Sequence, residues 1–278
     1  MPSSLLIRDL DGLDEVRAVE ELQKEVWGLQ DLDVTPLTHL VAAQVTGGQL
    51  IGAFDHETLV GFVYGFVGIE QGQTTHHSQM LAVKPAYRNL DVGYRLKVAQ
   101  RERVLAQGLT RITWTFDPLQ SVNAFFNFGK LGVVSDSYRV NFYGEETSSF
   151  LHRIGTDRLW LTWMLESNRV RRRLEGRVKI PEVEAASLPL VQVDADGLPS
   201  LHRELSGQSV LIQIPADINA LQREHPRHAI EWREITRRAF SEALAAGFLV
   251  ADFFRQSWNK QSGGVYLLTR NRRIEDLA

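Results

Sequence analysis

Hydrophobic and polar positions repeat with two different periods along the first half of the chain. Short β-branched or aromatic runs bounded by turn residues predict strands, and apolar residues three or four apart predict amphipathic helices. The predicted strands cover residues 5–8, 49–54, 59–68, 76–83, 111–116, 133–143 and 157–165. The predicted helices cover residues 13–27, 36–45, 92–107 and 121–130. This order, β-α-α-β-β-β-α-β-α-β-β, predicts an α+β domain.

The pattern changes after residue 166. A polar, weakly patterned stretch at 175–189 is followed by strand-like runs and one long amphipathic helical pattern at 226–246. The later strands are expected at 190–193, 210–214, 248–254 and 264–269. We therefore divide the chain into a domain at 1–166, a connector at 167–189 and an additional α+β part at 190–278.

The stretch at 80–108 combines a strand, a turn and a helix. An apolar run from Met80 to Val83 is ended by Pro85, and the tight basic loop 88–93 leads into the helix. Backbone amides at such a helix start, beside arginine side chains, suit a phosphate or pyrophosphate. The alternative is an ordinary strand-to-helix turn on a basic surface.

Composition excludes several classes of chemistry. The 278 residues include no cysteine, which excludes disulfides, thiolate metal sites and a cysteine nucleophile, and fits a reducing cytoplasm. The net charge of -3 gives no argument for nucleic acid as a partner. The sequence starts with a segment that turns acidic by Asp9, and no apolar run approaches the roughly 20 residues that span a membrane. We expect a cytoplasmic protein that binds neither nucleic acid nor membranes.

One charge cluster stands out, the arginine-rich run at 169–173. Runs of this kind on a helix are usually solvated, and we predict a solvated helix face here. The alternative is an anion-binding or subunit contact.

The element order and the loop at 88–93 together resemble the GNAT superfamily of acyl-CoA-dependent N-acyltransferases. Members carry an Arg/Gln-x-x-Gly-x-Gly/Ala loop whose amides bind the coenzyme A pyrophosphate. Arg88, Asp91 and Gly93 stand at its first, fourth and sixth places. Asp91 departs from the pattern, because it replaces a glycine and its carboxylate would repel a phosphate unless it turns away, for example toward Arg88 or Arg95.

A second stretch, WTFDPLQSVNAFFNFGKLG at 114–132, resembles a bacterial branch of this superfamily. Ala124, Lys130 and Gly132 match the family pattern. Phe128 stands where many members have a tyrosine that protonates the departing CoA thiolate. A phenylalanine has no proton to donate, so this role passes to another residue, to water or to nothing.

The resemblance implies a GNAT-type mixed, splayed central sheet flanked by helices over residues 5–166, with the C-terminal part as a degenerate second copy in the manner of tandem members. It implies an acyl-CoA co-substrate such as acetyl-CoA, with pantetheine between the fourth and fifth strands, and no metal. The residues that it assigns to coenzyme A are Met80, Leu81, Ala82, Val83, Arg88, Asn89, Leu90, Asp91, Val92, Gly93, Tyr94 and Asn123.

Acyl transfer to an amine needs a base, because the acceptor begins as an ammonium. His76 and His77 lie on one strand, so they face opposite sides of the sheet, and a histidine near its ordinary pKa is a good base. We take His77 as the candidate base and Glu70 as the alternative carboxylate. A hydrogen-bonded structural role for the histidines stays open.

The remaining candidate site residues lie after the fifth strand. Tyr138 is a candidate acid, and Asp117 and Tyr143 are candidate contacts to the acceptor. Asp117 before a proline is equally explained by turn capping, and aromatic residues on a strand by packing in the core.

The resemblance implies transfer of an acyl group, acetyl or succinyl, from acyl-CoA to the amine of a small molecule or amino acid. The alternative is a non-catalytic acyl-CoA-binding or assembly module that keeps the fold, since Asp91 and Phe128 each remove a usual feature of the site. A homodimer is compatible with either.

Overall fold

The computed structural model describes residues 5–144, 154–177, 188–194, 197–202, 205–258, 261–270 and 273–274. They fall into two compact units, which divide between Trp114 and Thr115. We call the described residues up to Trp114 unit 1 and those from Thr115 on unit 2. The division lies inside the strand β5 (Arg111–Phe116). The boundaries drawn from the sequence at 166 and 190 stay a prediction.

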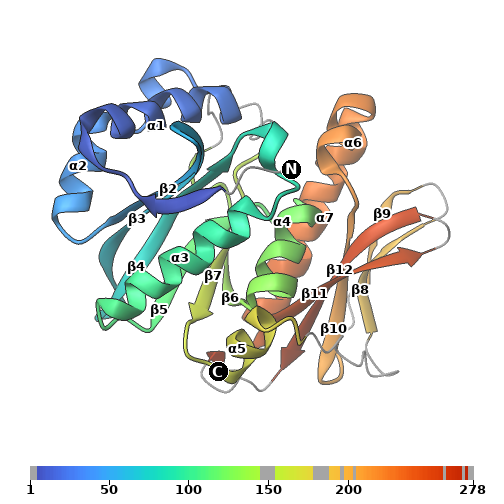
Figure 1. The fold of residues 1–278 in the computed structure, drawn as a ribbon. Helices are drawn as coiled ribbons and strands as arrows, with labels where there is room; N and C mark the ends of the chain where they lie inside the picture. The colour runs from blue at the N-terminus through green and yellow to red at the C-terminus, as the bar shows by residue number, and fades with distance from the viewer. Residues whose placement is uncertain are drawn as a thin grey trace. The chain divides into compact units, whose positions relative to one another are not determined.

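Unit 1 is built on a sheet with the order β1-β2-β3-β4-β5 (Figure 1). Its first four strands pair antiparallel, and they are β1 (Leu6–Asp9), β2 (Gln49–Asp55), β3 (Thr58–Glu70) and β4 (Gln73–Val83). β5 is parallel to β4 and is joined to it through His76 with Ile112 and His77 with Thr113. The sheet is therefore mixed, and its one parallel pair is short.

Helices cover both faces of this sheet (Figure 1). α1 (Gly12–Trp27) and α2 (Leu37–Val45) enclose a core on one face, formed with Leu50, Phe62 and Tyr64 among others. α3 (Val92–Ala106) covers the other face and buries Val92, Leu96 and Ala99 against β2 and β3. Short 3-10 turns, η1 (Asp31–Asp33) and η2 (Pro85–Tyr87), precede α2 and α3.

Within unit 2 the neighbouring strands follow the order β7-β6-β11-β12-β10-β8-β9. β8 pairs parallel with β10, and every other neighbouring pair in this order is antiparallel. The strands are β6 (Val134–Arg139), β7 (Arg158–Met164), β8 (Leu188–Val193), β9 (Pro199–Leu201), β10 (Ser209–Pro215), β11 (Phe248–Trp258) and β12 (Gln261–Arg270). The helices are α4 (Ser121–Ala124), the π-helical η3 (Phe125–Leu131), α5 (Asn168–Leu174), α6 (Ile218–Glu224) and α7 (Pro226–Ala245).

The expected fold class is confirmed, with a mixed sheet flanked by helices and an additional α+β part. Unit 2 also contains a repeated arrangement, since a helical segment precedes the hairpin β6/β7 and another precedes the hairpin β11/β12. The two hairpins meet antiparallel at Ser135 and Val250. Gln120 and Asn219, each four residues past a strand end, exchange two amide hydrogen bonds of 3.1 and 3.0 Å. This pairing supports the prediction of a degenerate second copy.

Two local expectations are corrected. The strand predicted at 133–143 ends at Arg139, because Asn141 adopts a left-handed conformation with φ 45° and its amide donates to Asp157. The arginine run at 169–173 is only partly a solvated face.

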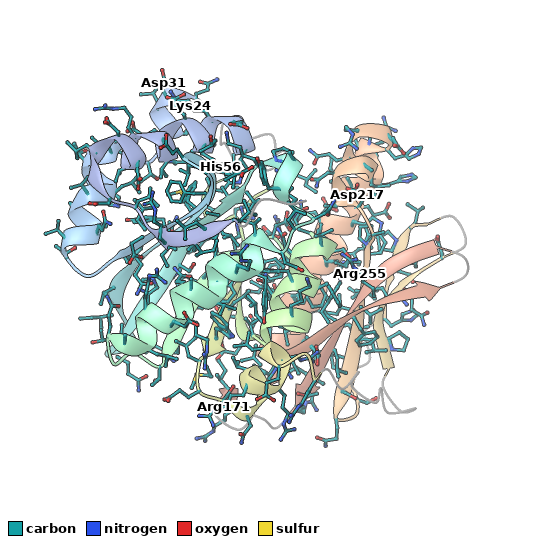
Figure 2. All side chains as sticks on the ribbon, viewed as in Figure 1. Lys24, Asp31, His56, Arg171, Asp217 and Arg255 are labelled. Carbon is teal, nitrogen blue, oxygen red and sulfur yellow. The ribbon has the colours of Figure 1, made fainter. Side chains whose placement is uncertain are left out.

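Within that run, Arg171 and Arg172 are exposed, and Figure 2 shows Arg171 projecting from α5. Arg173 is buried and donates to Asp252 Oδ2 (2.5 Å), and Arg169 donates to the carbonyl oxygens of Gly132 and Ala251. The helix packs against η3, and its buried residues Val170 and Arg173 are three positions apart and so lie on one face.

No helix among the described residues is both long enough and apolar enough to cross a membrane.

Candidate functional site

The loop between β4 and α3 ends in a left-handed residue. Asp91 has φ 52° and ψ 20° at the N-cap of α3, a conformation that glycine adopts freely and aspartate tolerates better than most residues. The first intrahelical bond runs from Arg95 N to Asp91 O, so the amides of Val92 and Gly93 lie ahead of the helical ladder. Aspartate therefore forms a left-handed turn that glycine also allows, and the role of this helix start as an anion site stays a prediction.

Gly93 has space above its backbone. A Cβ built on it would meet only Leu81 Cδ2 at 3.8 Å and Val83 Cγ2 at 3.9 Å, which are ordinary contacts. The protein's own packing therefore does not demand glycine at this position. Arg88 is exposed beside it, and its Nε donates to Val83 O (3.2 Å) across the base of the loop.

The edge of β4 that faces β5 opens at Ser78. The β4–β5 ladder ends with the pair His77 and Thr113, and in unit 1 as described no residue from Ser78 to Val83 pairs with β5. A β-bulge places Gln79 between the pairs that Ser78 and Met80 make with β3. Bulges re-aim the backbone next to functional sites. The open edge thus runs from the bulge to the loop at the start of α3, and unpaired strand groups of this kind accept amide-bearing ligands.

His76 is enclosed on the α3 face of the sheet and is fully buried. Gln100 Nε2 donates to His76 Nε2 (3.2 Å), which assigns the proton of the neutral ring to Nδ1. His76 Nδ1 is buried and has no hydrogen-bond partner. Burial, together with the charge of Lys97, lowers the pKa of His76 to about 3, so the ring is neutral at physiological pH.

His77 faces the opposite side of the sheet, as the strand geometry requires. Its ring lies 5.5 Å from that of Phe66, and Nδ1 is 3.1 Å from Thr113 Oγ1. It is half-buried, and burial with the charge of Lys97 lowers the pKa of His77 to about 4. His77 is therefore neutral near pH 7, with its proton-accepting nitrogens unprotonated, although the lowered pKa makes it a weaker base than an ordinary histidine. His76 has no access to solvent. Of the two histidines, only His77 has the exposure that a base needs.

A buried polar cluster, formed by Ser78 on β4 with Lys97 and Gln100 on α3, was not predicted from the sequence. Lys97 on α3 is 2% exposed, and its Nζ donates to Ser78 Oγ and to Gln100 Oε1, both at 3.0 Å. The face of Trp114 lies 3.8 Å from Nζ. Burial lowers the pKa of Lys97 well below its ordinary value. The sequence offered one clue to their burial. Lys97 and Gln100 each directly follow an apolar residue of the buried helix face, Leu96 and Ala99.

The buried pair of His76 and Gln100 depends on Gly65 in the neighbouring strand. A Cβ at Gly65 would stand 2.3 Å from His76 Nε2 and 3.0 Å from Gln100 Nε2. We expect Gly65→Ala to lower the free energy of unfolding by about 1–3 kcal/mol through overpacking. The matched control is Gly68→Ala on the same strand, where an added Cβ meets nothing within 4 Å. Denaturant unfolding that gives equal stabilities for the two variants would contradict this packing.

Glu70 lies away from His77. It pairs with Gln73 at the closed end of the β3–β4 hairpin, four ladder positions from the pair of Phe66 and His77. At about 3.3 Å per residue this separates the two strand positions by roughly 13 Å. The structure does not bring the two candidate bases together, and the role of Glu70 stays a prediction.

Tyr138, the candidate acid, belongs to a buried network in unit 2. Its hydroxyl donates to Asp157 Oδ2 (2.7 Å), and Arg237 binds both oxygens of the same carboxylate at 2.8 and 2.9 Å. Burial and the neighbouring Asp157 raise the pKa of Tyr138 well above its ordinary value. A phenol held in this way gives up its proton reluctantly, and its catalytic role stays a prediction.

Asp117, a candidate acceptor contact, is paired within unit 2. Its Oδ2 accepts from Arg233 Nη2 (2.7 Å) and its Oδ1 from the amide of Leu119 (2.9 Å), and Asp117 and Arg233 are 9% and 2% exposed. The capping interaction foreseen for this turn is present. An acceptor ammonium at Asp117 would share the carboxylate with Arg233, and that role stays a prediction.

The other predicted residues of unit 2 have simpler surroundings. Tyr143 is 43% exposed, and its hydroxyl lies 3.1 Å from Thr115 Oγ1. Asn123 is exposed on α4. Phe128 is fully buried between Phe116 and Tyr266, so it is a residue of the core.

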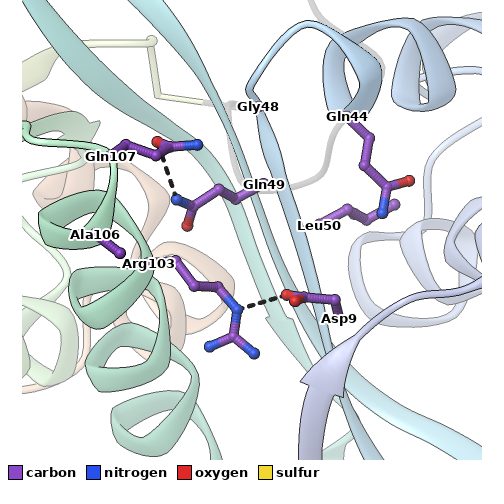
Figure 3. A pocket seen from close by; sticks show the side chains of 8 residues that line it. All are labelled: Asp9, Gln44, Gly48, Gln49, Leu50, Arg103, Ala106 and Gln107. Atoms are coloured by element: carbon purple, nitrogen blue, oxygen red, sulfur yellow. Dashed lines mark hydrogen bonds and ion pairs between the residues drawn. The ribbon is translucent and has the colours of Figure 1, made fainter.

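A pocket of about 350 Å³ lies at the opposite end of α3 from the loop (Figure 3). Within it Gln49 Nε2 donates to Gln107 Oε1 (3.3 Å), and Arg103 pairs with Asp9. Its lining consists of Asp9, Gln44, Gly48, Gln49, Leu50, Arg103, Ala106 and Gln107. None of the residues predicted for the site belongs to it. In the described ranges, no group of three or more histidine, aspartate or glutamate side chains is placed to hold a metal ion.

No protein-family model matches the chain. No curated protein matches its sequence.

Several solved structures are similar to part of it. The ribosomal-protein-S18-alanine N-acetyltransferase from Escherichia coli is 12% identical, with a TM-score of 0.47 over 59% of this chain and 95% of its own. Aminoglycoside 6'-acetyltransferase type Ii is 18% identical, with a TM-score of 0.47 over 58% and 98%. The PaiA N-acetyltransferase from Thermoplasma acidophilum in complex with coenzyme A is 16% identical, with a TM-score of 0.40 over 58% and 99%. Because these similarities are low, we argue function from the residues themselves.

Proposed function

We propose that this chain is an acyl-CoA-dependent N-acyltransferase of the GNAT type, with coenzyme A bound by unit 1. The observation that carries the proposal is Gly93, a glycine that neither packing nor a positive φ requires, at a helix start that follows an open strand edge. A phosphate can approach the backbone amides closely only where no side chain is in the way, as at Gly93. The similar solved structures, which are N-acetyltransferases, agree with this proposal without carrying it.

In this proposal the pyrophosphate lies against the loop 88–93 and the amides at the start of α3. The pantetheine arm then runs along the open edge of β4, from Val83 toward Ser78, and its amides add to the strand. Backbone groups of Met80, Leu81, Ala82 and Val83 provide the contacts. The thioester end arrives at the bulge at Gln79, where a re-aimed backbone N–H is suited to polarise the carbonyl.

Chemistry at that end requires a neutral amine. His77 is neutral, half-buried and close to the bulge in sequence, so it is the base that we propose for the acceptor ammonium. The acceptor is proposed as a small molecule or an amino acid, and the acyl group as acetyl or succinyl.

The alternative, a non-catalytic acyl-CoA-binding module, was based on two substitutions, Asp91 and Phe128. The structure weakens the argument from Asp91. Asp91 has a left-handed backbone conformation that glycine also adopts freely, so the turn is formed with aspartate at this position. Phe128 remains as the other support, since it leaves the departing thiolate without the usual donor.

A thermal shift measurement tests the proposal. With acetyl-CoA or succinyl-CoA at 100-fold excess over the dissociation constant we expect stabilisation of about 2.7 kcal/mol, because only the folded state binds the ligand. Adenosine, which has no pyrophosphate, is the control and should give no comparable shift. Equal, negligible shifts for all three compounds at millimolar concentration would refute the proposal.

A further inference from the structure

The replacement of the family's tyrosine by buried Phe128 raises the question of what protonates the departing thiolate. The donor has to lie where the open edge of β4 begins, because the pantetheine arm follows that edge from the loop at its other end. Ser78 is the first residue of β4 beyond the ladder with β5. From Val83 to Ser78 the edge measures about 17 Å at ~3.3 Å per residue, so the far end of an extended arm comes to Ser78.

Ser78 is hydrogen-bonded to the buried lysine Lys97. Lys97 Nζ donates to its Oγ at 3.0 Å, and both side chains are nearly enclosed, at 6% and 2% exposure. Gln100 Oε1 accepts a second N–H of Lys97 at 3.0 Å, and the face of Trp114 lies 3.8 Å away. Two acceptors and an aromatic face satisfy the three donor directions of an ammonium. Burying a lysine is costly, so a lysine buried next to an open strand edge is a candidate functional group.

We propose that Ser78 is the proton donor to the coenzyme A thiolate and that Lys97 is the positioning residue that resupplies its proton. This inference rests on the proposed function and extends it to a pair of residues outside the family pattern. As the amine nitrogen bonds to the acyl carbon, the C–S bond breaks and its electron pair goes to sulfur. Sulfur takes the proton of Ser78 Oγ, and Oγ takes one from Lys97 Nζ. Lys97 is left as a neutral amine and regains a proton from the one that the acceptor releases.

The surroundings fit this assignment. The titratable group of β4 on the same face as Lys97 is His76, and His77 lies on the opposite face of the sheet but still feels the charge of Lys97. Both rings are neutral near pH 7, because their pKa values are lowered to about 3 and 4. On its own helix the neighbour is neutral Gln100, and from β5 it is Trp114. Burial lowers the pKa of Lys97 itself, which makes its ammonium a better acid than an exposed lysine.

The test measures release of coenzyme A from acetyl-CoA with hydroxylamine as the acceptor. Hydroxylamine is a neutral nucleophile near pH 7, so this reaction needs no base and isolates protonation of the leaving group. A thiol reagent follows the reaction without background from the protein, because the chain has no cysteine, and the rate of the uncatalysed reaction without protein is subtracted. The variants are Lys97→Met, Ser78→Ala and Ser78→Thr. Lys24→Met is the matched control, since Lys24 is a surface lysine of unit 1 paired with Asp31 (Figure 2).

For Lys97→Met and Ser78→Ala we expect kcat to fall about 10²-fold, the low end for general acid catalysis because a thiolate is a good leaving group. The KM for acetyl-CoA should stay within about threefold, because neither side chain binds the coenzyme in the ground state. The wild-type rate should fall at alkaline pH as Lys97 loses its proton, and this limb should vanish in Lys97→Met. Ser78→Thr keeps a hydroxyl and should restore most of the rate.

Three results overturn the proposal. One is a Lys97→Met or Ser78→Ala protein with wild-type kcat, the second is an alkaline limb unchanged in Lys97→Met, and the third is wild-type protein that binds coenzyme A yet releases none with hydroxylamine. If Lys97→Met does not fold, Ser78→Ala decides the matter alone. Failure of the wild-type protein to bind acetyl-CoA would instead refute the proposed function and this inference with it, so the two failures are distinguishable.

Discussion

Replacing Asp117 with alanine is expected to lower the free energy of unfolding by about 3–5 kcal/mol, because it leaves the buried positive charge of Arg233 without its partner. Arg233 is 2% exposed, and its ion pair with Asp117 at 2.7 Å supplies the carboxylate next to its guanidinium. One nitrogen of that guanidinium, Nη1, already has no hydrogen-bond partner. Removing Asp117 therefore leaves the cation with still fewer acceptors. Denaturant unfolding monitored by circular dichroism measures the loss.

Two other variants identify the cause. Asp217→Ala removes an aspartate that caps α6 through the amides of Asn219 and Ala220 (Figure 2 labels it), and we expect a cost of only ~1 kcal/mol. Combining Asp117→Ala with Arg233→Met removes both charges and should recover much of the stability. A loss below about 1 kcal/mol in Asp117→Ala, or no recovery in the double variant, would contradict the buried ion pair.

The second large effect is on turnover. His77→Ala is expected to slow acyl transfer to an alkylamine by about 10²-fold, because the acceptor is an ammonium whose proton must be removed. With hydroxylamine, which is already neutral, the same variant should react at close to the wild-type rate. The dependence on acceptor separates a base from a residue that merely supports the fold. His56→Asn is the control, since His56 is 86% exposed in a turn with φ 54°, which asparagine tolerates.

The pH profile gives a second readout for His77. Its pKa is lowered from 6.5 to about 4 by burial and by the charge of Lys97, so the ring stays neutral on acidification down to about pH 4. The acid limb that His77 contributes to kcat/KM should therefore lie near pH 4 rather than near 6.5. Loss of activity centred on 6.5, or equal rates of His77→Ala and wild type with an alkylamine, would rule out His77 as the base.

The sequence was sufficient where structure is local. The loop at 88–93 and the hairpin of β2 and β3 follow from neighbouring residues, so their patterns predicted them. The two faces of β4 also follow from strand geometry, which placed His76 and His77 on opposite sides.

Contacts between residues far apart in the sequence could not be predicted. Lys97 is a charged residue on a helix, and only the close contact of α3 with β4 buries it against Ser78. Asp117 and Arg233 are separated by 116 positions, so no local pattern connects them. Arg173 turns inward for the same reason, because its partner Asp252 comes from a distant strand. Buried polar partners of this kind appear only when two elements meet.

Titration of coenzyme A into wild-type protein and Gly93→Ala, followed by calorimetry, is the most direct test of the account. An added Cβ makes only ordinary contacts at 3.8 and 3.9 Å, so Gly93→Ala should fold with wild-type stability. It should nevertheless bind coenzyme A at least about 10-fold more weakly, a loss of ~1.4 kcal/mol, because the methyl group occupies the space of the pyrophosphate. Saturable binding by the wild type with this loss in the variant is the predicted result. No saturable binding by the wild type, or equal affinities of the two proteins, would contradict a coenzyme A site at the start of α3.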